Sequence, residues 1–141
     1  MINGSGLVSS CKKQLLTGSH HFGTDTFYIA LYSDSAPLDL DLTTAYTTQG
    51  EISGTGYTAG GQALAGVQVL GPAAQTAYVT FNNPVWSGST LQARAALIYN
   101  KTFANNAVAI LDFGSDKYSN QGNFTVVFPP PGPTTALIRL V

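Results

Sequence analysis

Charged residues are scarce in this sequence, making up 9% of the chain against about 25% in ordinary soluble domains. Six Lys and Arg residues stand against seven Asp and Glu residues, so the net charge is −1. Lys12-Lys13 is the one basic pair, and without a basic stripe to neutralise phosphates we expect no nucleic-acid partner. A surface of uncharged polar side chains costs little to desolvate and repels its own copies weakly, which favours packing against protein partners.

Cysteine and long apolar runs are also lacking. Cys11 is the single cysteine, which excludes an internal disulfide and a cysteine-based zinc site, and we expect it to be a small residue on a helix face. No apolar run is long enough to span a membrane. The first residues, MINGSGLVSSCKKQ, lack the charged region followed by an apolar run that marks a secretory signal. We therefore expect a protein made in the cytoplasm, with no membrane partner.

What is present favours one β-rich domain over residues 1–141, large enough to bury a core unaided. An N-terminal arm, residues 1–25, should contain one short helix that Ser9 or Ser10 caps and Gly18 ends. Beyond it, turn residues recur roughly every eight to twelve positions, which predicts an all-β, antiparallel sandwich of jelly-roll or immunoglobulin-like topology. Strands are expected at 26–32, 64–69, 77–81, 91–99, 107–113, 124–128 and 136–140.

Two stretches depart from the strand pattern. Residues 33–61 carry Pro37, several Asp and Thr residues and a late cluster of glycines, which predicts a long Gly-rich loop that makes contacts. The stiff run Pro129-Pro130-Pro131-Gly132-Pro133 lacks most backbone donors, so it should be a connector or a blocked edge. Within the strand expected at 91–99, a period of two places Arg94 opposite the apolar face. Ile98 breaks this split, and we expect a neighbouring element, the long loop or another subunit to cover it.

The glycine cluster Gly54-Thr55-Gly56-Tyr57-Thr58-Ala59-Gly60-Gly61 looks like a phosphate-binding loop but fails in detail. A Walker loop ends in GK[ST], and no Lys follows here. A dinucleotide loop needs a helix after it, and the next segment is expected to be a strand. We therefore interpret the cluster as turns that need positive φ and close backbone approach. Glu51, the one Glu, could anchor it by accepting backbone N–H bonds.

Three other groups have a chemical appearance. Asp112-Phe113-Gly114 matches a kinase tripeptide without the rest of a kinase, so we expect a strand end with Phe113 inward and Gly114 turning. His20-His21 with Asp25 could bind a metal, but adjacent side chains on an extended segment point to opposite faces. No Ser, His and Asp set lies in a recognisable elbow. We expect no enzymatic activity, no catalytic residue, no cofactor and no metal.

Taken together, ordered pieces of the chain resemble a group of small tailed-bacteriophage virion proteins of about this length. The resemblance runs over nearly the whole sequence and is architectural, so it implies no catalytic residue. It rests on an N-terminal segment like LLTGSHHFGTDTFYIALYSDSA, then Glu51-x-x-Gly54-x-Gly56-Tyr57-x-x-Gly60-Gly61-x-x-Leu64, Trp86, Ala93-Arg94-x-Ala96-x-Ile98-Tyr99, Asp112-Phe113-Gly114 and a late strand near Arg139-Leu140.

The resemblance implies a structural protein of the virion, with a capsid decoration (cement) role favoured and the major capsid protein as partner. Symmetric closed oligomers suit seams between coat subunits, so we expect a homo-oligomer, with a trimer favoured. The arm at residues 1–10 and the loop at 33–61 are expected to contact neighbours. A tail, neck or adaptor component of the virion is an alternative. A host-surface carbohydrate-binding module is another, in which Trp86 and exposed Tyr residues would stack on sugars. We interpret Trp86 instead as a core or turn-packing residue.

Overall fold

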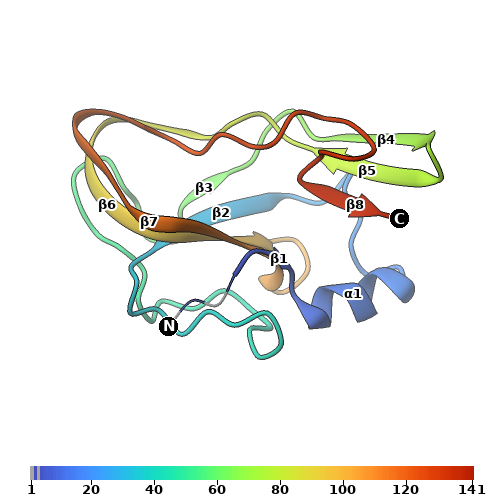
Figure 1. The fold of residues 1–141 in the computed structure, drawn as a ribbon. Coiled ribbons are helices and arrows are strands. Elements are labelled where there is room, and N and C mark those ends of the chain that lie inside the picture. Colours follow the sequence, from blue (N-terminus) through green and yellow to red (C-terminus); the bar gives the residue numbers. More distant parts are fainter. Residues whose placement is uncertain (1, 3) are drawn as a thin grey trace.

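The computed structural model describes residue 2 and residues 4–141, and it places most of the chain in antiparallel strands (Figure 1). A five-stranded sheet has the order β1-β7-β6-β2-β3, and a three-stranded sheet has the order β4-β5-β8. The two sheets pack together as an all-β sandwich, as the turn spacing predicts. The elements are β1 (Gly6–Leu7), α1 (Ser9–Leu16), β2 (Phe27–Tyr32), β3 (Gln62–Ala63), β4 (Gln68–Ala73), β5 (Thr76–Thr80), β6 (Val85–Asn100), β7 (Asn106–Thr125) and β8 (Ile138–Leu140).

Strands β6 and β7 form one long ribbon that passes through both layers. At one end of the ribbon β6 starts and β7 ends beside the three-stranded sheet; the ribbon then bends and continues into the five-stranded sheet (Figure 1). Their pairing shifts register at several points, including one where Ala93 opposes Lys117 and Ala95 opposes Asp112. An advance of two positions along β6 therefore corresponds to five positions along β7. Such bulges bend a strand and increase its twist.

The prediction of a polar loop between strands at 107–113 and 124–128 is wrong. Residues 114–123 belong to β7 and pair with the first half of β6. The side chains in this stretch do not alternate between apolar and polar. Backbone hydrogen bonds to β6 hold it as a strand, so it does not need that pattern. Residues 126–128 lie outside any strand, although Val126 and Phe128 are buried and Val127 between them is 74% exposed.

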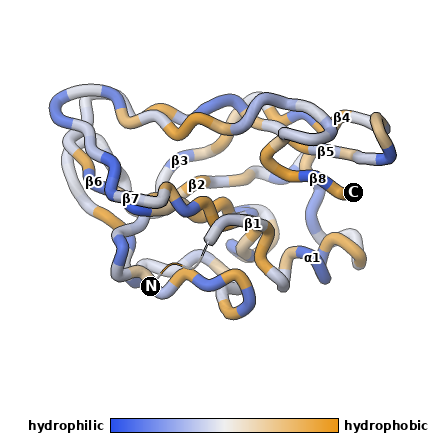
Figure 2. The backbone as a smooth tube through the Cα atoms, viewed as in Figure 1, coloured by the Kyte–Doolittle hydropathy of each residue, from blue (hydrophilic) through white to orange (hydrophobic). Residues whose placement is uncertain are grey.

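The core lies between and below the two sheets. All residues from Ala95 to Asn100 in β6 are buried, so both faces of this strand are covered. Figure 1 shows α1 and the segment after β2 below the five-stranded sheet, with the three-stranded sheet above it. That segment supplies the fully buried Ala36 and Leu38, and Ile98 on β6 is fully buried as well. In Figure 2 hydrophobic residues gather in the central strands, and the bend of the ribbon is mostly polar.

The short helix α1 is where expected, but its start is not. Val8 is the N-cap residue, and no described side chain caps the helix, so the prediction of a Ser9 or Ser10 cap is wrong. Val8 is fully buried, and burying it places both serines inside the first turn. Ser9 instead donates from Oγ to Asp41 Oδ1 over 2.6 Å. Gly18, with φ of +73°, follows the helix as predicted. Within the described residues, no helix combines the length and hydropathy needed to cross a bilayer.

Candidate functional site

Glu51 is the centre of a polar cluster that holds the glycine-rich segment in place. Its Oε1 accepts hydrogen bonds from the Tyr57 hydroxyl at 2.6 Å and from the Gly60 backbone N–H at 2.7 Å. Its Oε2 accepts one from the Tyr46 hydroxyl at 2.6 Å. The prediction that Glu51 anchors the glycine segment is confirmed. Sequence reasoning missed Tyr46 and Tyr57, because only the folding of residues 33–61 brings their hydroxyl groups to Glu51.

The tyrosines of this cluster are built into the fold. Tyr57 Oη accepts a hydrogen bond from the Leu31 N–H at 3.0 Å, and the Tyr99 hydroxyl donates to the Gly60 carbonyl at 2.6 Å. Tyr46 and Tyr99 stack with their ring centroids 4.8 Å apart. Burial, reinforced by the charge of Glu51, raises the pKa of Tyr99 to about 12 and raises the pKa of Tyr57 further. These phenols therefore stay protonated near neutral pH, so each can donate the hydrogen bond that it makes here.

The glycines of residues 54–61 form turns, as interpreted from the sequence. Gly56, Gly60 and Gly61 all have positive φ. A Cβ at Gly61 would overlap the carbonyl oxygen of Ile29 in β2, so the segment lies directly against the sheet. Beside Gly54, Thr55 accepts a backbone hydrogen bond from Thr90 in β6 at 3.0 Å. The N–H groups of Tyr57 and Gly61 are bonded within the segment, to the carbonyls of Gly54 and Thr58. The segment thus packs as a set of turns across β2, at Gly61, and β6, at Thr55.

Arg94 links the long loop to β7 at the ribbon's bulge. Its Nε donates to Asp112 Oδ1 at 3.1 Å, and one terminal nitrogen donates to Asp34 Oδ1 at 3.0 Å. The Gly114 N–H bonds Asp112 at 2.9 Å and, with Arg94, holds the pKa of that carboxyl below its usual range. Phe113 is half-buried against Phe124. The expectation of a strand end here is wrong, because the chain turns at Gly114 within a bulge and β7 continues.

Trp86 lies inside the protein. It is 5% exposed and packs between Tyr57 and Phe124, each with its ring centroid 6.1 Å away. The interpretation of Trp86 as a core residue is therefore confirmed. A carbohydrate module would need this ring at the surface to stack on a sugar, so Trp86 cannot serve that alternative, which is left with exposed tyrosines such as Tyr118.

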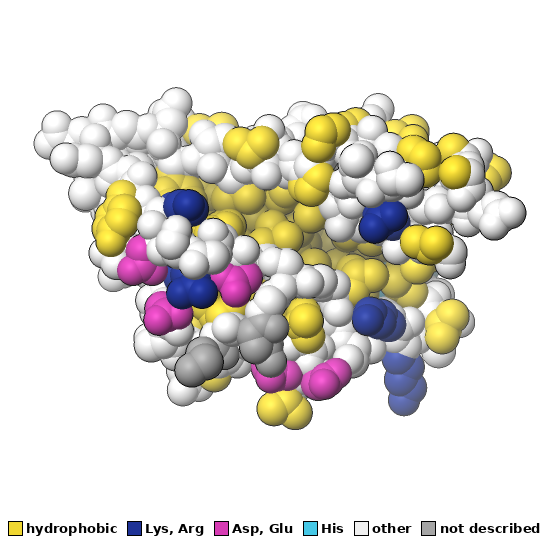
Figure 3. Space-filling view, in the orientation of Figure 1, with side chains coloured by type: hydrophobic (Ala, Val, Ile, Leu, Met, Phe, Trp, Pro, Cys, Tyr) yellow, Lys and Arg dark blue, Asp and Glu magenta, His cyan; other side chains and the backbone are white. Residues whose placement is uncertain are grey.

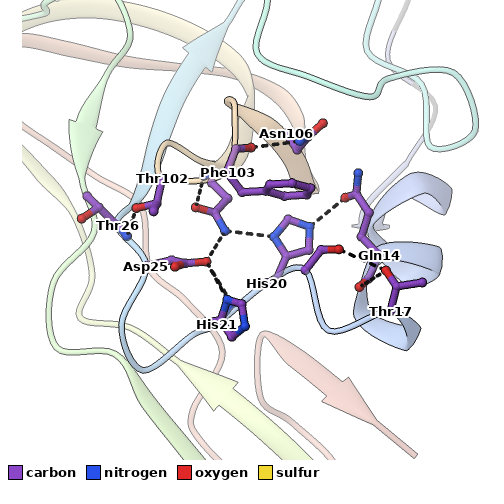
Figure 4. A network of polar contacts seen from close by, with 11 residues as sticks. Gln14, Thr17, His20, His21, Asp25, Thr26, Thr102, Phe103 and Asn106 are labelled. Atoms are coloured by element: carbon purple, nitrogen blue, oxygen red, sulfur yellow. Dashed lines mark hydrogen bonds and ion pairs between the residues drawn. The ribbon is translucent and has the colours of Figure 1, made fainter.

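The histidine pair separates as expected for adjacent side chains. His20 is 7% exposed, whereas the His21 side chain is 62% exposed. His20 instead joins a polar network with Gln14 and Asn100, and Asn100 also bonds Asp25 (Figure 4). Among the described residues, no three His, Cys, Asp or Glu side chains are grouped so as to hold a metal ion. The sequence signal for this network was a polar Asn at the end of an apolar strand.

The sandwich is open along one side, and its hydrophobic interior forms the floor of a groove there (Figure 3). We call this the open side, and it consists of two adjoining hollows of about 380 and about 480 Å³ between β7 and the chain that follows it. Tyr118 and Val127 at its rim are 69% and 74% exposed. Both hollows share Phe113, Val126 and Val127 in their linings, and the other apolar side chains there include Leu111, Phe124 and Leu137.

The outer edge of β7 forms one wall of the open side. Strand β1 covers this edge only at Ala109 and Ile110, and Ser5 Oγ accepts the Asp112 N–H at 2.7 Å. Beyond that point, no described strand pairs with this edge. An unpaired strand edge beside an apolar groove can accept an extended segment from another chain. The open side therefore has the arrangement of a binding surface, whereas the polar clusters around Glu51 and Arg94 hold loops in place.

Comparisons of this chain with protein-family models, with curated proteins and with solved structures found no match.

Proposed function

We propose that this protein is a structural component of a tailed-phage virion, a capsid decoration protein that attaches to the major capsid protein through its open side. The proposal draws on the ordered motifs from Glu51 to Arg139, which resemble small virion proteins, and on the low charge of the chain. The open side is the single structural observation that carries it. Its apolar floor and exposed rim are what a protein partner would cover.

The chemistry of the open side points to an extended apolar segment of the coat as the occupant. The unpaired β7 edge offers backbone donors and acceptors, and the groove offers space for alternate side chains. Lys117 and Asp112 line the two hollows with opposite charges, so the face has no strong preference for an acidic or a basic partner. Many weak contacts of this kind, repeated by the symmetry of a shell, would hold the protein by avidity.

The predicted contact segments need revision in light of the packing. Of the arm, Met1 and Asn3 lie outside the described residues, whereas Ile2 and Val8 are buried in the protein's own core. Deleting this arm would remove β1 and disturb the fold, so the deletion cannot test attachment. The loop at 33–61 buries Ala36 and Leu38, and its exposed side chains, such as the 80% exposed Leu42, remain available for contact.

Replacing Val127 by Asp should weaken attachment to coat shells by about tenfold or more while leaving the protein folded. The side chain already faces solvent, so the charge costs little in the free protein but must be desolvated in the complex. Co-sedimentation with purified shells measures the effect. A second variant, Leu42→Asp, changes a similarly exposed site on the long loop, the other predicted contact segment. Loss with Leu42→Asp alone would move the contact to the loop and contradict the proposed face.

The role itself is tested by counting copies of the protein in purified virions. We expect quantitative mass spectrometry to give a ratio to the major capsid protein that is close to stoichiometric. A dozen or so copies for each particle would assign the protein to the neck or tail instead. Absence from the particle would overturn the virion role altogether.

A further inference from the structure

His20 joins the N-terminal helix to the central sheet from a buried position. It lies on the segment between α1 and β2, and its ring contacts side chains from α1 and from β6 (Figure 4). The ring Nε2 lies 2.8 Å from Gln14 Oε1, and Nδ1 lies 3.1 Å from Asn100 Nδ2. The Asn100 side chain is fully buried. Nothing in the Glu51 cluster or the open side uses this network.

The partners of Asn100 determine where the proton sits on His20. The Phe103 backbone N–H can only donate, and it lies 3.1 Å from Asn100 Oδ1. The Asp25 carboxylate accepts, and its Oδ2 lies 2.8 Å from Asn100 Nδ2. The amide is thus fixed with its NH₂ group toward His20, so Nδ1 must accept a hydrogen bond and carry no proton. The ring proton is on Nε2, which donates to Gln14.

The surroundings of His20 also disfavour a charged ring. The rings of Phe22, Phe27 and Phe103 lie 6.4, 6.4 and 5.4 Å from it between centroids. Asp25 and His21, on the same segment, are the titratable groups that act on it, while α1 contributes the neutral Gln14 and β6 the neutral Asn100. Burial lowers the pKa of His20 below its ordinary 6.5, with Asp25 opposing and His21 adding to this effect.

We propose that His20 is an acid-operated latch, whose protonation releases α1 and the following segment from β6. A proton on Nδ1 would face the Asn100 NH₂ group, so one hydrogen bond would be replaced by a contact between two donors. Rotating the Asn100 amide would relieve this contact only by setting its oxygen against Asp25 and its NH₂ group against the Phe103 N–H. Release would uncover Cys11, which is fully buried on α1. It would also widen the apolar hollow that Leu15 and Phe22 form with Val69 and Leu140.

The direction of the pH dependence follows from linkage. Because the folded pKa of His20 lies below the unfolded value, the unfolded chain binds more protons in that window. The stabilisation is complete above about pH 6.5, falls as the pH drops below it, and levels off below the folded pKa. Although burial acts to raise it, hydrogen bonds from Asn100 and the His21 backbone hold the pKa of Asp25 below its usual range. Its contribution is therefore lost only at lower pH, below about 3.9.

The test uses Cys11, the single cysteine, as a reporter of release. The full-length protein is labelled with 4,4′-dithiodipyridine at about pH 7.5 and about pH 5, and each rate is divided by that of the urea-unfolded chain at the same pH. We expect the relative rate to rise severalfold at the lower pH. The ceiling is about thirtyfold, because about pH 5 lies roughly 1.5 units below the ordinary histidine pKa. Fluorescence of Trp86, the single tryptophan, should stay unchanged, since release is local.

Two variants separate the latch from a general effect of acid. His20→Asn keeps an acceptor for Asn100 but cannot be protonated, so its relative rate should not change with pH. His21→Asn removes the exposed neighbour, which has the smallest of the three influences on the His20 pKa, so the rise at the lower pH should persist. An equal rise in His20→Asn, or no rise in the wild type, would overturn the proposal. If His20→Asn does not fold, NMR titration of the wild type decides the matter, because a His20 ring titrating at or above 6.5 would contradict the latch.

Discussion

Gly61→Ala should destabilise the protein by about 4 kcal/mol or more, or prevent folding, which makes it the most damaging small substitution in the glycine-rich segment. An added Cβ would overlap the Ile29 carbonyl group and press on Ala30. These atoms belong to β2, which pairs with β6 on one side and β3 on the other, so the backbone has little room to move. The φ of +81° adds a conformational cost of about 1–2 kcal/mol. Urea unfolding monitored by Trp86 fluorescence measures the loss.

Gly88→Ala is the matched control for this substitution. Gly88 also has positive φ, at +56°, but an added Cβ would meet no described atom within 4 Å. It should therefore show the conformational cost alone, about 1–2 kcal/mol. Equal losses at Gly61 and Gly88 would mean that the close approach to β2 contributes nothing.

Replacing Glu51 by Ala should cost about 3–4 kcal/mol of unfolding free energy. The carboxylate accepts hydrogen bonds from Tyr46, Tyr57 and the Gly60 backbone, and hydrogen bonds to a charged group contribute about 1.5–3 kcal/mol each. Glu51 is half-buried, so water can replace part of this loss. Glu51→Gln keeps the shape and two polar atoms, and it should cost about half as much.

A double-mutant cycle shows whether the loss comes from these contacts. Tyr57→Phe alone should cost about 1 kcal/mol or more, because it removes one donor from Glu51 and one acceptor from Leu31. In the Glu51→Ala background the same change should cost less, since the shared hydrogen bond is already gone. Strict additivity would mean that Glu51 stabilises the fold by another route.

The strands could be predicted from the sequence where the residue types alone mark a strand. The segment from Phe27 to Tyr32 is rich in aromatic residues, and the second half of β6 is mostly apolar; both were expected as strands. Trp86 and the anchoring role of Glu51 were also predicted. These features depend on composition and on short-range turns, which a sequence displays directly.

The features that sequence reasoning missed all depend on distant partners. Residues 114–123 look like a loop because their side chains are polar, and only pairing with β6 makes them a strand. Ser9 is not the N-cap residue as expected, because Val8, which is fully buried, takes that position. The position of Asn100 against His20 joins residues 80 apart in the chain. The open side is likewise invisible in the sequence, because it is defined by the part of the outer β7 edge with which no described strand pairs.

The ribbon of β6 and β7 also has a mechanical meaning. The same two strands run through both layers (Figure 1). The layers therefore cannot separate without deforming these strands. A tensile load between them would be carried along the covalent strands and concentrated at the bulge between Ala93 and Ala95. Arg94 sits at that point and ties it to Asp112 and Asp34. Under such a load the protein should therefore bend at this bulge before the hydrogen bonds between strands break in either sheet.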